Sequence, residues 1–107
     1  MSTDPTPDPD PYEISPSARV VDELRALVGR ADAVGLRPQV LESLRRINRI
    51  LTIYPQFGEP LRDLQMPGET LRILTVPPLL VRYILDEPNR KVFIVEPFKA
   101  MPHAGFQ

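Results

Sequence analysis

The chain has 107 residues, of which 42% are hydrophobic and 25% are charged, and its net charge is −1. This length fits a single domain, and this balance is that of a globular protein rather than a disordered or membrane-embedded one. The chain has no cysteine and one histidine, His103. This excludes disulfides and thiolate metal sites and argues against a histidine-based metal site or catalytic triad.

The N-terminal segment differs from the rest of the chain. Residues 2–11 read STDPTPDPDP, where repeated X-Pro bonds and Asp charges oppose a packed structure, so we expect a disordered tail at residues 1–11. This segment lacks the features of a signal peptide, and no apolar run reaches the roughly 18 residues of a membrane span. We therefore expect a cytoplasmic protein without membrane contact. Outside the tail, 13 Lys and Arg face 11 acidic residues, a net charge of about +2 that is compatible with nucleic acid but does not indicate it.

The first half of the folded part has the pattern of a strand and two helices. Residues 12–14 (YEI) predict a short strand, and Ser15 as cap with Pro16 as first helical residue predicts a helix over 16–34 that ends at Gly35. Pro38 opens a second helix, which Pro55 closes. Because the connection is short, the two should form an antiparallel hairpin.

The second half has β character. Residues 56–68 contain two Gly and two Pro and predict a structured loop, with Phe57, Leu61 and Leu64 as its anchors to the core. Three segments rich in branched and aromatic residues, 70–76, 79–85 and 92–96, predict strands. Between the first two, Pro77-Pro78 requires either a wider loop or a cis bond. The expected fold is α+β, with a short N-terminal strand and a helical hairpin packed on an antiparallel sheet of three to four strands.

Familiar catalytic signatures are absent. There is no Gly-rich phosphate loop, nucleophile elbow or metal-ligand spacing, so we expect neither a cofactor nor a metal. The remaining candidates are cations: Arg62 in the loop, Arg72 and Arg82 inside strands, and Lys99 after the last strand. An Arg in a strand must reach water, a carboxylate or a ligand. For Arg72 the alternatives are an ion pair with Asp63 or Glu96 and a contact with phosphate or a partner.

The second predicted helix carries a further group of cations. Arg45, Arg46 and Arg49 lie largely opposite its apolar stripe. One interpretation is a solvated face, partly paired through Glu42 at i+3 and i+4. The other is a contact with nucleic acid or a partner, for which Arg45 and Arg49 are the phosphate-binding candidates.

The order of elements and one loop resemble a known family. A short strand, a helical hairpin, the loop P-x-F-G-x-P-L-x-x-L at residues 55–64 and three antiparallel strands are similar to the RelE/ParE superfamily of toxin–antitoxin toxins. The likeness covers about residues 12–100, which we treat as the domain, with a C-terminal tail at 101–107. It implies an antitoxin partner that wraps the toxin. In the RelE branch it implies metal-independent cleavage of mRNA on the ribosome by basic residues, and in the ParE branch DNA gyrase as the target.

Carried onto this chain, the resemblance selects Arg72, Arg82 and Lys99 as catalytic candidates and Arg62, Arg45 and Arg49 as RNA-binding candidates. The chain differs from the family where Tyr-Arg often opens the third strand, because Leu79-Leu80 stands there. After the last strand, residues 97–102 read PFKAMP, and only Lys99 matches the family's basic or His/Tyr cluster. Two functions remain open: a toxin-like endoribonuclease or its degenerate relative, and a non-catalytic protein-binding domain, including one with a gyrase-type target.

Overall fold

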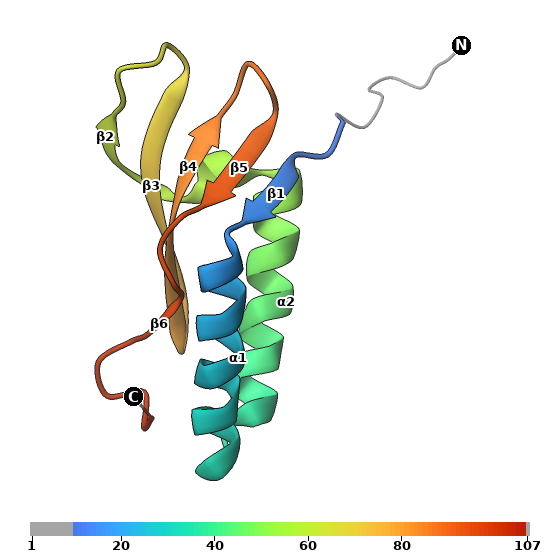
Figure 1. Cartoon of the computed structure of the whole chain (residues 1–107), viewed down its shortest axis with the longest axis vertical. Helices are drawn as coiled ribbons and strands as arrows, with labels where there is room; N and C mark the ends of the chain where they lie inside the picture. The colour runs from blue at the N-terminus through green and yellow to red at the C-terminus, as the bar shows by residue number, and fades with distance from the viewer. Residues whose placement is uncertain (1–9, 107) are drawn as a thin grey trace.

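The computed structural model describes residues 10–106 and confirms the α+β class. Two helices lie side by side against one face of a single sheet (Figure 1). In chain order, the first elements are β1 (Glu13–Pro16), α1 (Ala18–Ala33), α2 (Arg37–Ile53) and the 3-10 turn η1 (Pro55–Phe57). They are followed by β2 (Glu59–Asp63), β3 (Glu69–Val76), β4 (Leu79–Asp86), β5 (Lys91–Ile94) and β6 (Lys99–Ala100). Of the predicted tail, residues 1–9 lie outside the described part of the chain.

The helical hairpin forms where the pattern predicts it, but its first cap differs. Ser17 is the N-cap of α1, and its side-chain oxygen accepts a hydrogen bond of 3.2 Å from the Val20 amide. The prediction of Ser15 and Pro16 was wrong by two residues, because Pro16 is the last residue of β1. Gly35 ends the first helix as expected, since its φ of 77° suits glycine.

The sheet is larger than predicted. Its order is β1-β5-β4-β3-β2, with β6 paired to the first residues of β4. β1 runs parallel to β5, and the other neighbouring strands run antiparallel to each other. The predicted sheet of three to four strands was therefore too small, and its antiparallel direction is confirmed for every pair except β1–β5. The parallel pair follows from the intervening chain, because a parallel connection needs a long crossover and the helical hairpin supplies part of it.

Two strands were missed because their sequences are poor strand formers. β2 lies in the segment predicted as a loop and contains Pro60, which an edge strand tolerates because one side has no ladder to complete. Its register against β3 shifts between Pro60 and Arg62, which marks a bulge. β6 has only two residues and forms beside Leu79 and Leu80. Neither has the alternating apolar pattern on which strand prediction depends.

The core lies between the helices and one face of the sheet. Alternate residues of β3, β4 and β5 face α1 and α2, as their burial shows. The sheet contributes Leu74, Val76, Leu79, Val81, Tyr83, Leu85, Val92 and Ile94, and the helices contribute Val20, Leu27, Ala31, Val40, Ile47 and Leu51. Phe106 is also buried, so the last described residues of the predicted C-terminal segment pack on this core.

The turn η1 is held by hydrogen bonds rather than by the predicted apolar anchors. The Tyr83 hydroxyl donates to the Pro55 carbonyl at 2.5 Å. Arg72 Nη1 donates to the carbonyls of Gln56 at 3.1 Å and Gly58 at 2.7 Å. The expectation that Phe57 and Leu61 anchor the loop was wrong, because both side chains are exposed.

The connection between β3 and β4 consists of Pro77 and Pro78 alone. Their peptide bond is cis, which confirms one of the two predicted arrangements. The β4–β5 hairpin predicted at residues 86–90 is also present, and Asp86 accepts hydrogen bonds from the Asn89 amide and side chain within it.

Replacing Tyr83 by Phe removes the hydroxyl that satisfies a buried carbonyl. We expect the free energy of unfolding to fall by about 1–3 kcal/mol, measured by urea denaturation. Tyr54 is exposed, so Tyr54→Phe is the matched control and should change stability by less than about 0.5 kcal/mol. Equal effects of the two substitutions would contradict the role given to Tyr83.

The same hydroxyl predicts an alkaline dependence of stability. Burial raises the pKa of Tyr83 from 10.0 to about 12, against the lowering effects of the Arg72 cation and the Gly58 amide. A folded pKa above the unfolded one means that the contribution is complete below pH 10 and is lost as the pH rises to about 12. Over that range the wild type should lose on the order of 2–3 kcal/mol more stability than Tyr83→Phe in urea titrations. Parallel stability curves would contradict this.

Candidate functional site

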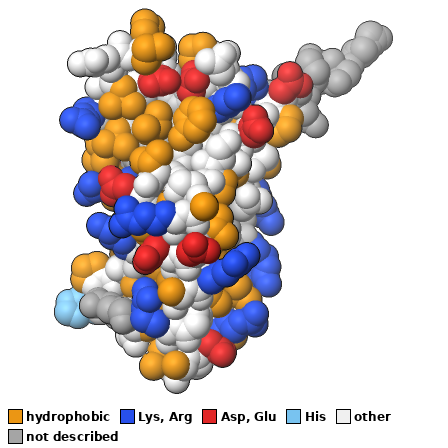
Figure 2. Space-filling model, viewed as in Figure 1, with side chains coloured by type: hydrophobic (Ala, Val, Ile, Leu, Met, Phe, Trp, Pro, Cys, Tyr) orange, Lys and Arg blue, Asp and Glu red, His pale blue; other side chains and the backbone are white. Residues whose placement is uncertain are grey.

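The face of the sheet turned away from the helices is the main candidate surface. Strand register places Leu71, Ile84 and Phe93 in one row across β3, β4 and β5. Ile73 lies on the same face in the next row and Leu80 in the row beyond it, and all five side chains are partly exposed. Figure 2 shows hydrophobic side chains gathered over β2 to β5 with charged side chains of both signs around them. We call these five residues the open face.

Three of the predicted cations lie around the open face. Arg62 is opposite Leu71, Arg82 is opposite Ile73, and Lys99 is opposite Leu80. Arg82 approaches Glu96 at 3.9 Å, and both side chains are half exposed. Arg62 and Lys99 therefore lie at the edges of the open face, whereas Arg82 lies within it, between Leu80 and Ile84 on β4.

Arg72 lies on the other side of the sheet. It is opposite Tyr83 in the register, on the face that the helices cover. Its guanidinium donates to backbone carbonyls of η1 and, through Nε, to the Thr70 hydroxyl at 3.1 Å. The expected ion pair with Asp63 or Glu96 is not among its contacts with the described residues. Arg72 is thus separated from Arg82 and Lys99 by the thickness of the sheet.

The other two candidates lie on the helical layer. Arg45 and Arg49 are exposed on α2. Arg45 Nη1 is 3.0 Å from Glu42 Oε1, so the predicted pairing through Glu42 is confirmed at i+3. The six predicted site residues therefore fall into three places: the open face with its edges, the helix-covered face and the outer side of α2.

The described residues contain no acidic or histidine group suited to metal binding. No cluster of three or more His, Asp or Glu occurs among residues 10–106. His103 lies exposed in a C-terminal turn with a φ of 68°. Nor does any helix of this part of the chain combine the length and the hydropathy that crossing a bilayer requires.

The helical side of the molecule contains an apolar hollow. A hollow of about 240 Å³ lies between α1, α2 and the β1–β5 side of the sheet. Its lining is aliphatic and aromatic apart from Asn48, as the set Ile14, Val21, Leu24, Leu44 and Phe98 illustrates. Such a lining suits an apolar group but offers no acid, base or nucleophile.

Comparisons with known proteins bear on the fold. No family model and no curated protein matches the chain. A solved structure described as "Chromosomal ParDE TA system from P. aeruginosa" is similar to it over 85% of this chain and 97% of that chain, with a TM-score of 0.54. The two chains share a fold, which agrees with the RelE/ParE-like fold expected from the sequence. Because the two sequences are only 14% identical, this similarity is one of fold alone.

Sequence reasoning located this RelE/ParE-like fold but missed parts of its sites. Tyr83 was not singled out, although an aromatic residue with a hydroxyl in a buried strand needs a hydrogen-bond partner. The signal for the open face in the sequence is the alternation of Leu71 and Ile73 in strand 70–76, which puts two apolar side chains on one side of that strand. Among the described residues, both helices lie on the opposite side (Figure 1).

The placement of Arg72 and Arg82 predicts different effects of substitution. Arg72→Ala leaves the carbonyls of Gln56 and Gly58 without this donor, so we expect a loss of about 1–3 kcal/mol in the free energy of unfolding. Arg82→Ala removes only a half-exposed ion pair and should cost less than about 1 kcal/mol. Urea denaturation of both variants measures the difference. A larger loss for Arg82→Ala would contradict the placement.

Proposed function

We propose that this protein is the toxin-like member of a type II toxin–antitoxin system and that it acts by binding a protein through the open face. The fold shared with a chain of a solved ParDE TA system supports the class of function. The observation that carries the mode of action is the apolar row Leu71, Ile84 and Phe93, bordered by Arg62 and Arg82. The proposal includes a cytoplasmic location and an antitoxin as one of its protein partners.

The chemistry of the open face favours a protein over a nucleic acid. Protein interfaces have an apolar centre with a polar rim, and arginine is common in them. A groove for RNA needs cations along the path of the phosphates. Here the row Leu71, Ile84 and Phe93 is aliphatic and aromatic. Arg62 and Lys99 lie at the edges of the open face, and Arg82 is a single cation in the neighbouring row. A cellular target of the gyrase type and an antitoxin segment would both fit such a surface.

Metal-independent cleavage of mRNA is the second candidate. Its supporting observation is that Arg82 and Lys99 lie on the same side of the sheet, with Arg62 farther along the same face. These cations could hold phosphates and stabilise developing negative charge. The role predicted for Arg72 fits less well, because its guanidinium already serves three oxygens of the protein.

Induced expression in bacterial cells tests the two candidates together. We expect growth arrest by the wild type and its loss in Leu71→Glu with Ile84→Glu, because two carboxylates would be buried in the interface. Arg82→Ala with Lys99→Ala should still arrest growth. Val34→Glu, at an exposed apolar position beyond α1, is the matched control and should act like the wild type.

The readout separates the outcomes. If Arg82→Ala with Lys99→Ala abolishes arrest and cleavage of ribosome-bound message, the ribonuclease replaces the proposal. If the wild type does not arrest growth and captures neither gyrase nor an antitoxin, the toxin-like function is wrong. Circular dichroism of each purified variant verifies that the fold is retained.

A further inference from the structure

We propose that the outer side of α2 and the turn η1 form a second binding surface, which takes a single-stranded nucleic acid. The surface consists of Arg46, Arg49, Ile53, Tyr54 and Phe57, and we call it the α2 stripe. Its cations would contact phosphates and its aromatic rings would stack on bases. The stripe lies on the helical layer, so this inference is independent of the open face.

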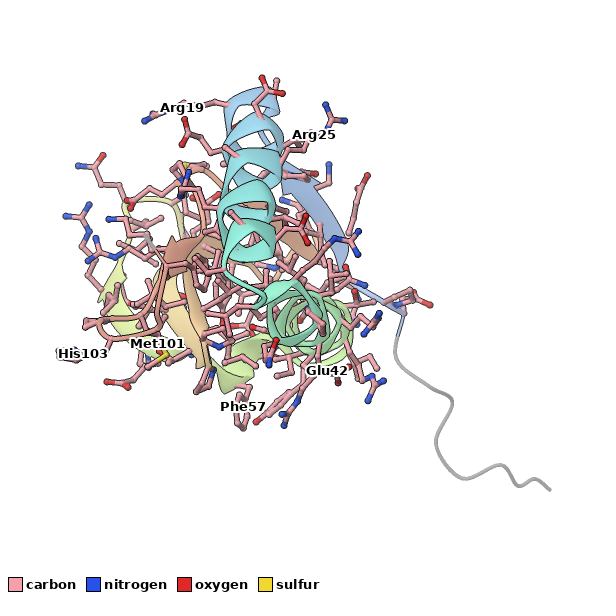
Figure 3. The ribbon with its side chains drawn as sticks, turned by 90° about the horizontal axis from the view of Figure 1, so that it is seen from below. Arg19, Arg25, Glu42, Phe57, Met101 and His103 are labelled. Carbon is pink, nitrogen blue, oxygen red and sulfur yellow. The ribbon has the colours of Figure 1, made fainter. Side chains whose placement is uncertain are left out.

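The stripe is continuous along the helix. Residues 46, 49 and 53 follow one another at intervals of three and four, which places them on one side of α2. Tyr54 and Phe57 extend the row beyond the end of the helix. From residue 46 to residue 54 the row spans about 12 Å at the helical rise. Phe57 projects from the same side of the molecule as Glu42 of α2 (Figure 3).

The apolar part of the stripe is unusually exposed. Ile53, Tyr54 and Phe57 are 60%, 57% and 63% exposed, respectively, and they are neighbours. The rings of Tyr54 and Phe57 have centroids 6.4 Å apart and are inclined at 56°. Both side chains are more than half exposed, so each ring offers surface on which a base can stack.

The turn holds these rings outward. Pro55 is buried, and its carbonyl accepts the hydrogen bond from Tyr83. Arg72 donates to the carbonyls of Gln56 and Gly58, the residues before and after Phe57. The Phe57 amide also donates to the Tyr54 carbonyl at 3.0 Å, so Phe57 is presented on a constrained backbone. Less conformational entropy is therefore lost when a base stacks on it.

The charge of the stripe is positive and uncompensated within the described residues. Arg45 is neutralised by Glu42. Arg46 and Arg49 form no ion pair with a described carboxylate. Unpaired arginines along one side of a helix are the electrostatic footprint expected for a phosphate backbone.

The dimensions favour a strand of nucleic acid over a protein. A stable protein interface buries about 800 Å² on each partner. An aromatic side chain buries about 150–250 Å² even when it is fully covered, so three apolar side chains in a single row fall short. Stacking and phosphate contacts do not require a wide surface. Single strands also present base faces that a duplex hides.

Fluorescence anisotropy with the full chain tests this inference. The probes are a labelled oligouridine of about twelve nucleotides and a duplex of equal length, titrated over a series of salt concentrations. We expect the wild type to prefer the single strand. Tyr54→Ala with Phe57→Ala should weaken its binding about tenfold or more, because stacking on two bases is lost. Arg46→Ala with Arg49→Ala should weaken binding and lower the salt slope by about 1.4.

A charge-matched variant provides the control. Arg19 and Arg25 project from α1, away from Phe57 (Figure 3), so Arg19→Ala with Arg25→Ala removes the same charge and should change affinity less than about twofold. The inference is overturned if the wild type binds neither probe, if the aromatic variant binds like the wild type, or if the control weakens binding as much as Arg46→Ala with Arg49→Ala. Loss of binding by the stripe variants while growth arrest persists would support it and leave the open-face function intact.

Discussion

Three backbone carbonyls decide how the two layers of this protein meet. Those of Pro55, Gln56 and Gly58 accept hydrogen bonds from Tyr83 and Arg72, two side chains on adjacent strands. A buried carbonyl without a donor would cost more than a hydrogen bond gains, so these contacts constrain the path of the chain from α2 into β2. The position of β2 at the sheet edge and the outward direction of Phe57 both depend on that path.

The same arrangement explains why the cations divide among different surfaces. Successive residues of a strand point to opposite faces, so Arg72 and Arg82 can share a surface only if the strand register brings them to one side. In this sheet Arg72 is opposite Tyr83 and Arg82 is opposite Ile73. One arginine therefore stabilises the fold and the other lies within the open face. Charge alone does not distinguish them.

The parts of the fold that could be predicted from the sequence are those with a strong local signal. Apolar periodicity and the stop at Gly35 located the helical hairpin, and branched residues located β3, β4 and most of β5. β2 could not be predicted because Pro60 is acceptable only at an edge, and the edge exists only in the assembled sheet. The separation of the candidate cations onto different surfaces could not be predicted for a related reason. It depends on how the strands pair, and no single segment of the sequence encodes that pairing.

The close approach of η1 to the sheet also changes the meaning of the loop motif at residues 55–64. A Cβ atom added at Gly58 would lie 1.9 Å from the Tyr83 hydroxyl oxygen, so only glycine fits at that position while Tyr83 stays in place. The contact between Gly58 and Tyr83 is therefore a requirement of the fold, whether or not the protein acts on a target. The loop therefore reflects the architecture of the domain rather than its target, and a change in what the open face binds would leave the requirement for Gly58 unaltered.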